Sequence, residues 1–359
     1  MPISRRRLLV STGSALTAAA LPVAPPRVVR RELRVITADG VGIRAREMRP
    51  LSPSRGEPII LVHGARAPGI ASFDLPVSHG SLAEDLVVRL NRVVYIMDAR
   101  GYGGSDRPSA MEAPPGESRP LSRTYEVARD IDAVALEARK LCKAERVDLL
   151  GWATGGSWAA CYACLWPERV AHLVSLNALY GATSAHAMLG PQSDTADPAH
   201  PDRLNPNLGG YGLYEGASLL RVWDRTIPDT DKASWRDPAI AAAYVAATLA
   251  SDPDSSNHNP PAFRAPLGAI EDSFYQAAGR RLYDASAITA HVLAVRSERD
   301  FWSRSEDAAA LSHDAVRARS MKILTIPGAT HFVHLDRPPH GRELLLQEVA
   351  YFLGSCKSA

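Results

Sequence analysis

Short apolar runs alternate with helical patterns along most of this chain, and the alternation limits the possible folds more than any other feature. A buried strand of a parallel sheet is typically a short continuous apolar run. Between such runs, the segment from Thr124 to Cys142 has apolar residues at helical spacing. Alternation of this kind indicates an α/β fold, a mostly parallel sheet flanked by helices. The expected strands are Pro58–Val62, Arg92–Met97, Val147–Leu150, Val170–Leu176, His291–Val295 and Met321–Ile326.

A hairpin is expected before the first of these strands. Val28–Ile36 is rich in Val and Ile, and Asp39-Gly40 provides a two-residue turn into Val41–Glu47. Residues 27–177 therefore read as the first part of the α/β core, and residues 286–359 as its second part.

The segment 178–285 interrupts the alternation. It has no clear strand pattern and many Pro, Gly, Asp and Asn residues, while Asp237-Pro238 is a good start for a helix to about Ala250. We expect an inserted helical cap over a pocket. Aromatic side chains of this segment could form an apolar site, namely Tyr211, Tyr214, Trp223 and Tyr244.

The N-terminus is typical of an export signal. Arg5, Arg6 and Arg7 precede a mildly apolar stretch from Leu8, and 18–20 is a run of three alanines that suits signal cleavage. Residues 1–26 are predicted to be a twin-arginine-type signal and linker. The mature protein would then be periplasmic or secreted and would keep no integral membrane segment.

Composition excludes several classes of protein. The 41 basic and 39 acidic residues give a net charge of +2, which disfavours a nucleic-acid partner. The chain has only four cysteines, and they and the histidines lack the spacing of a metal site. The run 101–104, Gly-Tyr-Gly-Gly, lacks the Lys-Ser/Thr of a phosphate-binding loop. We expect a small-molecule substrate and neither metal nor cofactor; nothing indicates an oligomeric state.

Four loops that follow expected strands contain the chemically useful residues. They are His63-Gly64, the glycine-rich run 151–156, Asp300 and His331. Ligands of open parallel sheets bind at the carboxyl ends of strands, so these loops are expected to meet at one edge.

These motifs resemble the α/β-hydrolase superfamily over residues 28–178 and 286–353. The loop Asp98–Ser105 is similar to one that follows a core strand in such enzymes, and the order of nucleophile position, acid and histidine also matches. The resemblance implies hydrolysis of a small carboxylic ester or lactone.

The resemblance also assigns roles to residues. His331 would be the general base and Asp300 the group that orients it, with His334 and Glu298 as the nearest alternatives. The backbone amides of Ala65 and Thr154 would form the oxyanion hole. The substrate-binding candidates are Arg66, Trp152 and Phe73.

One position departs from the family pattern. The nucleophile elbow has small residues at Gly151 and Gly155, but its centre is Ala153 instead of serine. A methyl group cannot attack a carbonyl, so Ala153 is either a knockout substitution or a natural loss. Three functions remain open: a triad hydrolase lacking its nucleophile, base chemistry by His331 and Asp300 without a covalent intermediate (water activation, or a lyase or cofactor-free oxygenase type), and ligand binding on an inactive scaffold.

Overall fold

The computed structural model describes residues 28–54, 56–191 and 193–354. The expected export signal and linker, residues 1–26, lie outside this range. No helix within the described residues is both long and apolar enough to cross a membrane.

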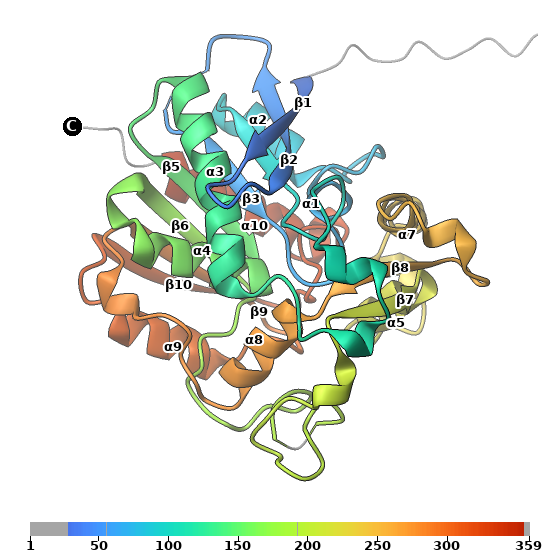
Figure 1. The fold of residues 1–359 in the computed structure, drawn as a ribbon. Helices are drawn as coiled ribbons and strands as arrows, with labels where there is room; N and C mark the ends of the chain where they lie inside the picture. The colour runs from blue at the N-terminus through green and yellow to red at the C-terminus, as the bar shows by residue number, and fades with distance from the viewer. Residues whose placement is uncertain (1–27, 55, 192, 355–359) are drawn as a thin grey trace, which may run out of the picture.

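An eight-stranded sheet forms the centre of the molecule, in the order β1-β2-β4-β3-β5-β6-β9-β10 (Figure 1). Strands β1 and β2 form an antiparallel hairpin, and β2 also pairs antiparallel with β4. The remaining neighbouring strands are parallel. The strands are β1 (Val28–Ile36), β2 (Gly42–Pro50), β3 (Ile59–Val62), β4 (Val94–Met97), β5 (Val147–Trp152), β6 (Val170–Leu176), β9 (His291–Ser297) and β10 (Ser320–Ile326).

Helices cover both faces of this sheet, as the alternation predicts. The helices α3 (Thr124–Cys142) and α4 (Thr154–Leu165) pack on each other in front of the sheet in Figure 1, and α2 (Leu82–Leu90) packs with α10 (Arg342–Gly354) behind it. The short α1 (Gly69–Phe73) follows β3, and α9 (Ser305–Asp314) lies between β9 and β10 in the chain. The mostly parallel sheet with flanking helices is confirmed.

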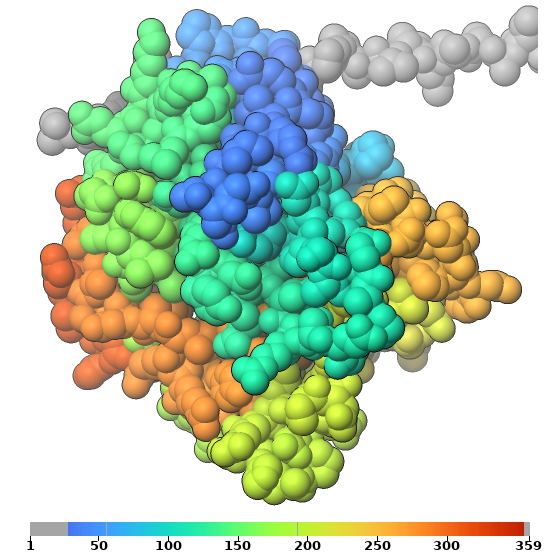
Figure 2. All heavy atoms as spheres, viewed as in Figure 1, coloured from blue at the N-terminus to red at the C-terminus, as the bar shows by residue number. Residues whose placement is uncertain are grey.

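The inserted segment contains both helices and strands. Its helices are α5 (Ala217–Asp224), α6 (Lys232–Trp235), α7 (Pro238–Ala250) and α8 (Gly268–Ala277). The expectation of no strand was wrong, because β7 (Tyr211–Glu215) and β8 (Ala262–Pro266) pair as an antiparallel ribbon. Figure 2 shows the insert, yellow-green to orange, along the lower and right-hand margins of one face.

The four central strands β3, β4, β5 and β6 are buried along their whole length, which fixes where the site must form. All residues of β3, β4, β5 and β6 are buried, so the chain returns to the surface only at the strand ends. The loops after β3, β5, β9 and β10 leave the same edge of the sheet because these strands are parallel. The insert begins after β6 and adds its own side chains to this edge.

Candidate active site

The turn from β5 into α4 is a sharp elbow with Ala153 at its centre. Ala153 has φ 52° and ψ −123°, a backbone conformation that side chains rarely adopt. A Cβ on Gly151 would overlap the carbonyl of Gly155, and a Cβ on Gly155 would overlap the carbonyl of Val62. The two glycines therefore permit the elbow. Ala153, the expected nucleophile position, lines the cavity described below.

Asp300 and His331 meet at the same edge of the sheet. In β9 and β10, Ser297 pairs with Ile326, and beyond this pair the amide of Arg299 donates to the carbonyl of Ala329 at 2.9 Å. The His331 Nδ1 lies 2.6 Å from the Asp300 Oδ1. Both side chains are almost fully buried.

Asp300 is held in its ionised form by its neighbours. It accepts hydrogen bonds from the Trp302 amide at 3.0 Å and from both the amide and hydroxyl of Ser303. Burial by itself would raise the pKa of Asp300, but the charge of His331 and these hydrogen bonds outweigh burial and lower that pKa. The carboxylate can therefore orient the imidazole through Nδ1 and stabilise its protonated form.

The backbone of His331 is fixed by two side chains, one at the end of β5 and one directly after β6. Its carbonyl accepts from the Trp152 Nε1 at 3.0 Å and from the Asn177 Nδ2 at 3.1 Å. Asn177 also bonds to Ser297 through both ends of its amide. The sequence reasoning missed Asn177 and Ser303; the position of Asn177 directly after a buried strand was the available signal.

The loop after β3 supplies the candidate oxyanion-hole residue Ala65. The buried ring of His63 accepts from the Ala99 amide at Nε2, so its Nδ1 donates to the Gly64 carbonyl at 2.7 Å. Burial lowers the pKa of His63, in keeping with this neutral tautomer. Ala65 and Thr154, the first residue of α4, both line the cavity. A first-turn helix amide has no acceptor within its own helix.

A cavity of about 300 Å³ opens between the elbow and the insert. Ala153, His331, Arg66 and Trp152 line it, together with Tyr214 and Tyr244 from the insert. Phe73 is not among the lining residues described; it is fully buried and packs on His334. The remaining lining is mainly apolar: Met188, Leu189, Leu208, Leu219, Val222, Leu267, Ile270, Phe301, Trp302 and Phe332.

The other aromatic candidates of the insert have structural contacts instead. The Tyr211 hydroxyl donates to the carbonyl of Ala113, and the Trp223 Nε1 donates to Asp336 at 2.8 Å. Trp223 also stacks on Phe332, with ring centroids 4.7 Å apart. Trp223 thereby ties the insert to the loop that carries His331, and Tyr211 ties it to the segment after β4.

The alternative acid and base occupy other places. His334 is buried against Trp152, and Glu298 accepts from the amide of Gly328. Ser157, one turn into α4, donates to the carbonyl of Leu179. Among the described residues, no hydroxyl or thiol makes a hydrogen bond to the Nε2 of His331, so this nitrogen has no nucleophile beside it.

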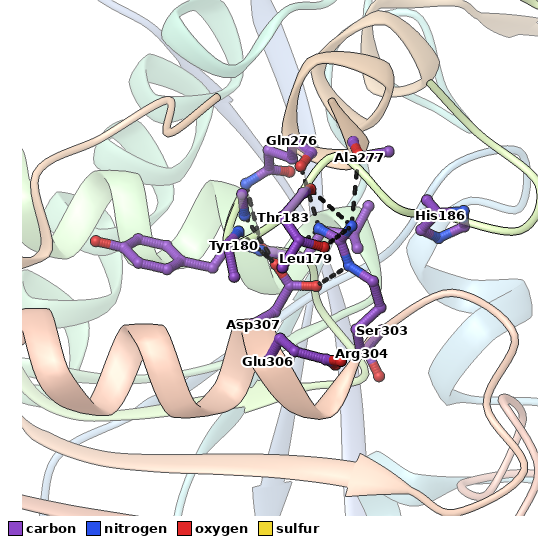
Figure 3. Close-up of polar contacts among 12 residues, drawn as sticks. Leu179, Tyr180, Thr183, His186, Gln276, Ala277, Ser303, Arg304, Glu306 and Asp307 are labelled. Atoms are coloured by element: carbon purple, nitrogen blue, oxygen red, sulfur yellow. Dashed lines mark hydrogen bonds and ion pairs between the residues drawn. The ribbon is translucent and has the colours of Figure 1, made fainter. Parts of the chain in front are cut away.

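A polar cluster joins the Asp300 loop to both ends of the insert (Figure 3). Asp307 accepts from the amides of Tyr180, Gly181 and Ala182, where the insert begins. Arg304 donates to Asp307 and to carbonyls at both ends of the insert, those of Thr183 and Gln276 among them. Because Arg304 follows Ser303 directly, the insert and the acid of the site share one anchor.

No cluster of His, Cys, Asp and Glu within residues 28–54, 56–191 and 193–354 could hold a metal ion. The chemistry that these residues can supply is acid–base chemistry at His331, next to two candidate amide donors.

Comparison with known proteins agrees with the fold. A family model described as the alpha/beta hydrolase fold matches residues 57–338. Among solved structures, E-2-(acetamidomethylene)succinate hydrolase is similar, with 19% identity, 90% of this chain and 99% of the other covered, and a TM-score of 0.55. An esterase from Rhodococcus sp. ECU1013 is similar at 16% identity, with 91% and 99% covered and a TM-score of 0.56.

An esterase from Exiguobacterium antarcticum is similar at 17% identity, with 89% and 98% covered and a TM-score of 0.53. No curated protein matches the sequence. At these identities the solved structures show the fold, and the family model shows the membership: the chain belongs to the α/β-hydrolase family.

Proposed function

We propose that the cavity binds a small carboxylic ester or lactone and that this chain keeps the acid–base part of a hydrolase triad without its nucleophile. The observation that carries the proposal is the 2.6 Å contact between His331 and Asp300 at a cavity whose elbow holds Ala153. The names of the similar structures, esterases and a hydrolase, support the same reaction class.

The step that this chain lacks is nucleophilic attack from position 153, where a methyl group replaces a hydroxyl. A serine hydroxyl there would attack the carbonyl carbon and pass its proton to the His331 Nε2, which would then protonate the leaving alkoxide. Water would cleave the acyl-enzyme to the carboxylic acid by the same base. With Ala153, no bond to the enzyme can form, and His331 can deprotonate only water or the substrate itself.

Restoring the hydroxyl tests this proposal. The Ala153→Ser variant should react with a fluorophosphonate probe and should hydrolyse short aromatic esters or lactones at least about 10³-fold faster than the chain as written, since loss of such a serine costs roughly 10⁶ in kcat. The double variant Ala153→Ser/His331→Ala should lose both properties. A folded Ala153→Ser protein that neither labels nor hydrolyses any of these compounds would contradict the proposal.

A second candidate is base chemistry without a covalent intermediate. It is favoured by the intact hydrogen bond between His331 and Asp300, because Asp300 keeps three further hydrogen bonds although no nucleophile is present. Turnover by the chain as written that disappears in His331→Ala would establish this candidate. Ligand binding that survives His331→Ala, with no turnover, would instead indicate an inactive binding scaffold.

A further inference from the structure

The cavity carries positive charge without a matching negative charge. Its lining includes Arg66 and Arg225 but, among the described residues, neither aspartate nor glutamate. Asp300, the acid of the candidate site, is not among the lining residues and is hydrogen-bonded to the Nδ1 of His331. A cavity lined in this way favours an anionic ligand, provided that the two arginines are free to bind one.

Arg66 is held by an aromatic ring and not by a carboxylate. Its Cζ lies 4.5 Å from the centroid of the Tyr214 ring, and no carboxylate oxygen of the described residues lies within 4.0 Å of its guanidinium nitrogens. Burial raises the pKa of Tyr102 and of Tyr244, and the charge of Arg66 opposes this in both. The hydroxyls near Arg66 are thus uncharged, and stacking leaves the N–H edge of a guanidinium available.

Arg225 follows α5 and approaches the same cavity from the insert. Its Nη1 lies 3.3 Å from the Met188 Sδ, a weak acceptor for a charged donor. Among the described residues it too has no carboxylate oxygen within 4.0 Å. The two cations therefore reach one cavity from the core and from the insert.

Arg66 is half-buried and Arg225 is exposed, and neither is paired with a carboxylate of the described residues, whereas two buried arginines are neutralised. Arg100 bonds to Asp130 and Asp39, and Arg264 bonds to Asp252. An unpaired, partly desolvated cation is costly unless a ligand supplies the counter-charge. In Arg66 that charge sits directly after Ala65, the candidate oxyanion-hole residue.

We infer that the cavity selects a substrate bearing a carboxylate in addition to its reactive ester or lactone group. Guanidinium binds a carboxylate through two parallel hydrogen bonds, and the otherwise apolar lining suits a short hydrocarbon chain between the two groups. Hydrolysis of such a half-ester consumes one water and yields a dicarboxylic acid and an alcohol. The ester or lactone group in this inference rests on the proposed function, whereas the carboxylate rests on the two arginines of the cavity.

Binding to the chain as written tests the charge preference without turnover. We would measure by calorimetry the affinities of glutarate, monomethyl glutarate and the neutral dimethyl glutarate. The two anions should bind about 10-fold or more tightly than the diester, as charge-assisted hydrogen bonds imply. In Arg66→Met this ratio should fall to about 2-fold or less, whereas Arg317→Met, an exposed arginine in the turn before β10, should leave it unchanged. Equal affinities for the three ligands would overturn the inference.

Turnover by Ala153→Ser separates this inference from the proposed function. Faster hydrolysis of the monomethyl esters of succinate, glutarate or adipate than of the dimethyl esters, by about 10-fold in kcat/KM, supports both. If both ester types are hydrolysed at equal rates, the proposed function is kept and the preference for a carboxylate-bearing substrate is rejected. If glutarate binding depends on Arg66 but Ala153→Ser shows no turnover, the carboxylate preference is kept and the proposed function is rejected.

Discussion

At the elbow, the carbonyl oxygens of Val62 and His63 occupy the space that a side chain at position 155 would need. Val62 ends β3 and His63 follows it directly, so neither carbonyl can move without disturbing the end of this strand. Gly155→Ala should therefore destabilise the protein by about 3 kcal/mol or more, the upper range for overpacking a core. Urea unfolding measures the change.

Gly116 provides the matched control for this prediction. A Cβ there would meet no heavy atom within 4 Å, and its φ is not in the left-handed region. Gly116→Ala should change the free energy of unfolding by less than about 1 kcal/mol. Equal effects of the two substitutions would show that the close approach at the elbow does not constrain position 155.

Individual site residues were predictable where the chain direction alone placed them. Ala153, Asp300 and His331 follow the parallel strands β5, β9 and β10, and parallel strands bring their ends together. Asn177 and Ser303 were not found, because their roles depend on side-chain directions that spacing does not encode. Phe73 was assigned to the pocket as a loop aromatic; it lies in α1 and is buried.

At the scale of elements, α9 fastens the insert to the core through its first turn. Asp307 is fully buried and its Oδ1 accepts three consecutive backbone amides, while its Oδ2 pairs with Arg304. Asp307→Ala would leave these donors without an acceptor. We expect a loss of about 3 kcal/mol in the free energy of unfolding, as for one partner removed from a buried ion pair.

The neighbour Glu306 separates this role from a general effect of charge in the first turn of α9. Glu306 is exposed, and its side chain bonds only to Ser305 among the described residues. Glu306→Ala should stay within about 0.5 kcal/mol of the parent. In the Ala153→Ser background, Asp307→Ala should also lower kcat more than Glu306→Ala, because Arg304 adjoins the Asp300 loop.

Elements with a strong local pattern were placed well from the sequence. The helix Thr124–Cys142 was found with both its ends, and Pro238–Ala250 begins at the expected Asp-Pro pair. The strands β7 and β8 were missed because a two-stranded ribbon separated by 46 residues leaves no local hairpin signal. Their pairing depends on the insert folding as a whole.

At the scale of the whole molecule, a further buried carboxylate, Asp336, joins the insert to the core beside the site. Asp336 accepts from the Trp223 Nε1 at 2.8 Å and from the Thr330 hydroxyl at 2.7 Å. No guanidinium, ammonium or imidazole nitrogen of the described residues lies within 4.0 Å of it. Burial accordingly raises the pKa of Asp336 to about 6, against the hydrogen bonds that lower it.

This raised pKa fixes the sign of a pH effect. The folded state holds the Asp336 proton up to about pH 6, while an unfolded aspartate releases it near pH 4. The unfolded state thus binds fewer protons in this window, and the contribution of Asp336 to stability falls as pH rises through it. Above pH 6 the contribution is constant.

Asp336→Asn removes the titration and keeps one acceptor oxygen in place of the two that accept from Trp223 and Thr330. The stability of the parent relative to this variant should fall by about 1–2 kcal/mol between about pH 4.5 and about pH 7.5. Other groups, including the buried Asp130, titrate in both proteins and cancel in the difference. Asp202→Asn, an exposed carboxylate of the insert, should change the difference much less, since water solvates its charge. A parent that gains stability relative to Asp336→Asn as pH rises would mean that Asp336 is compensated by a cation, and that the insert closes over the site differently.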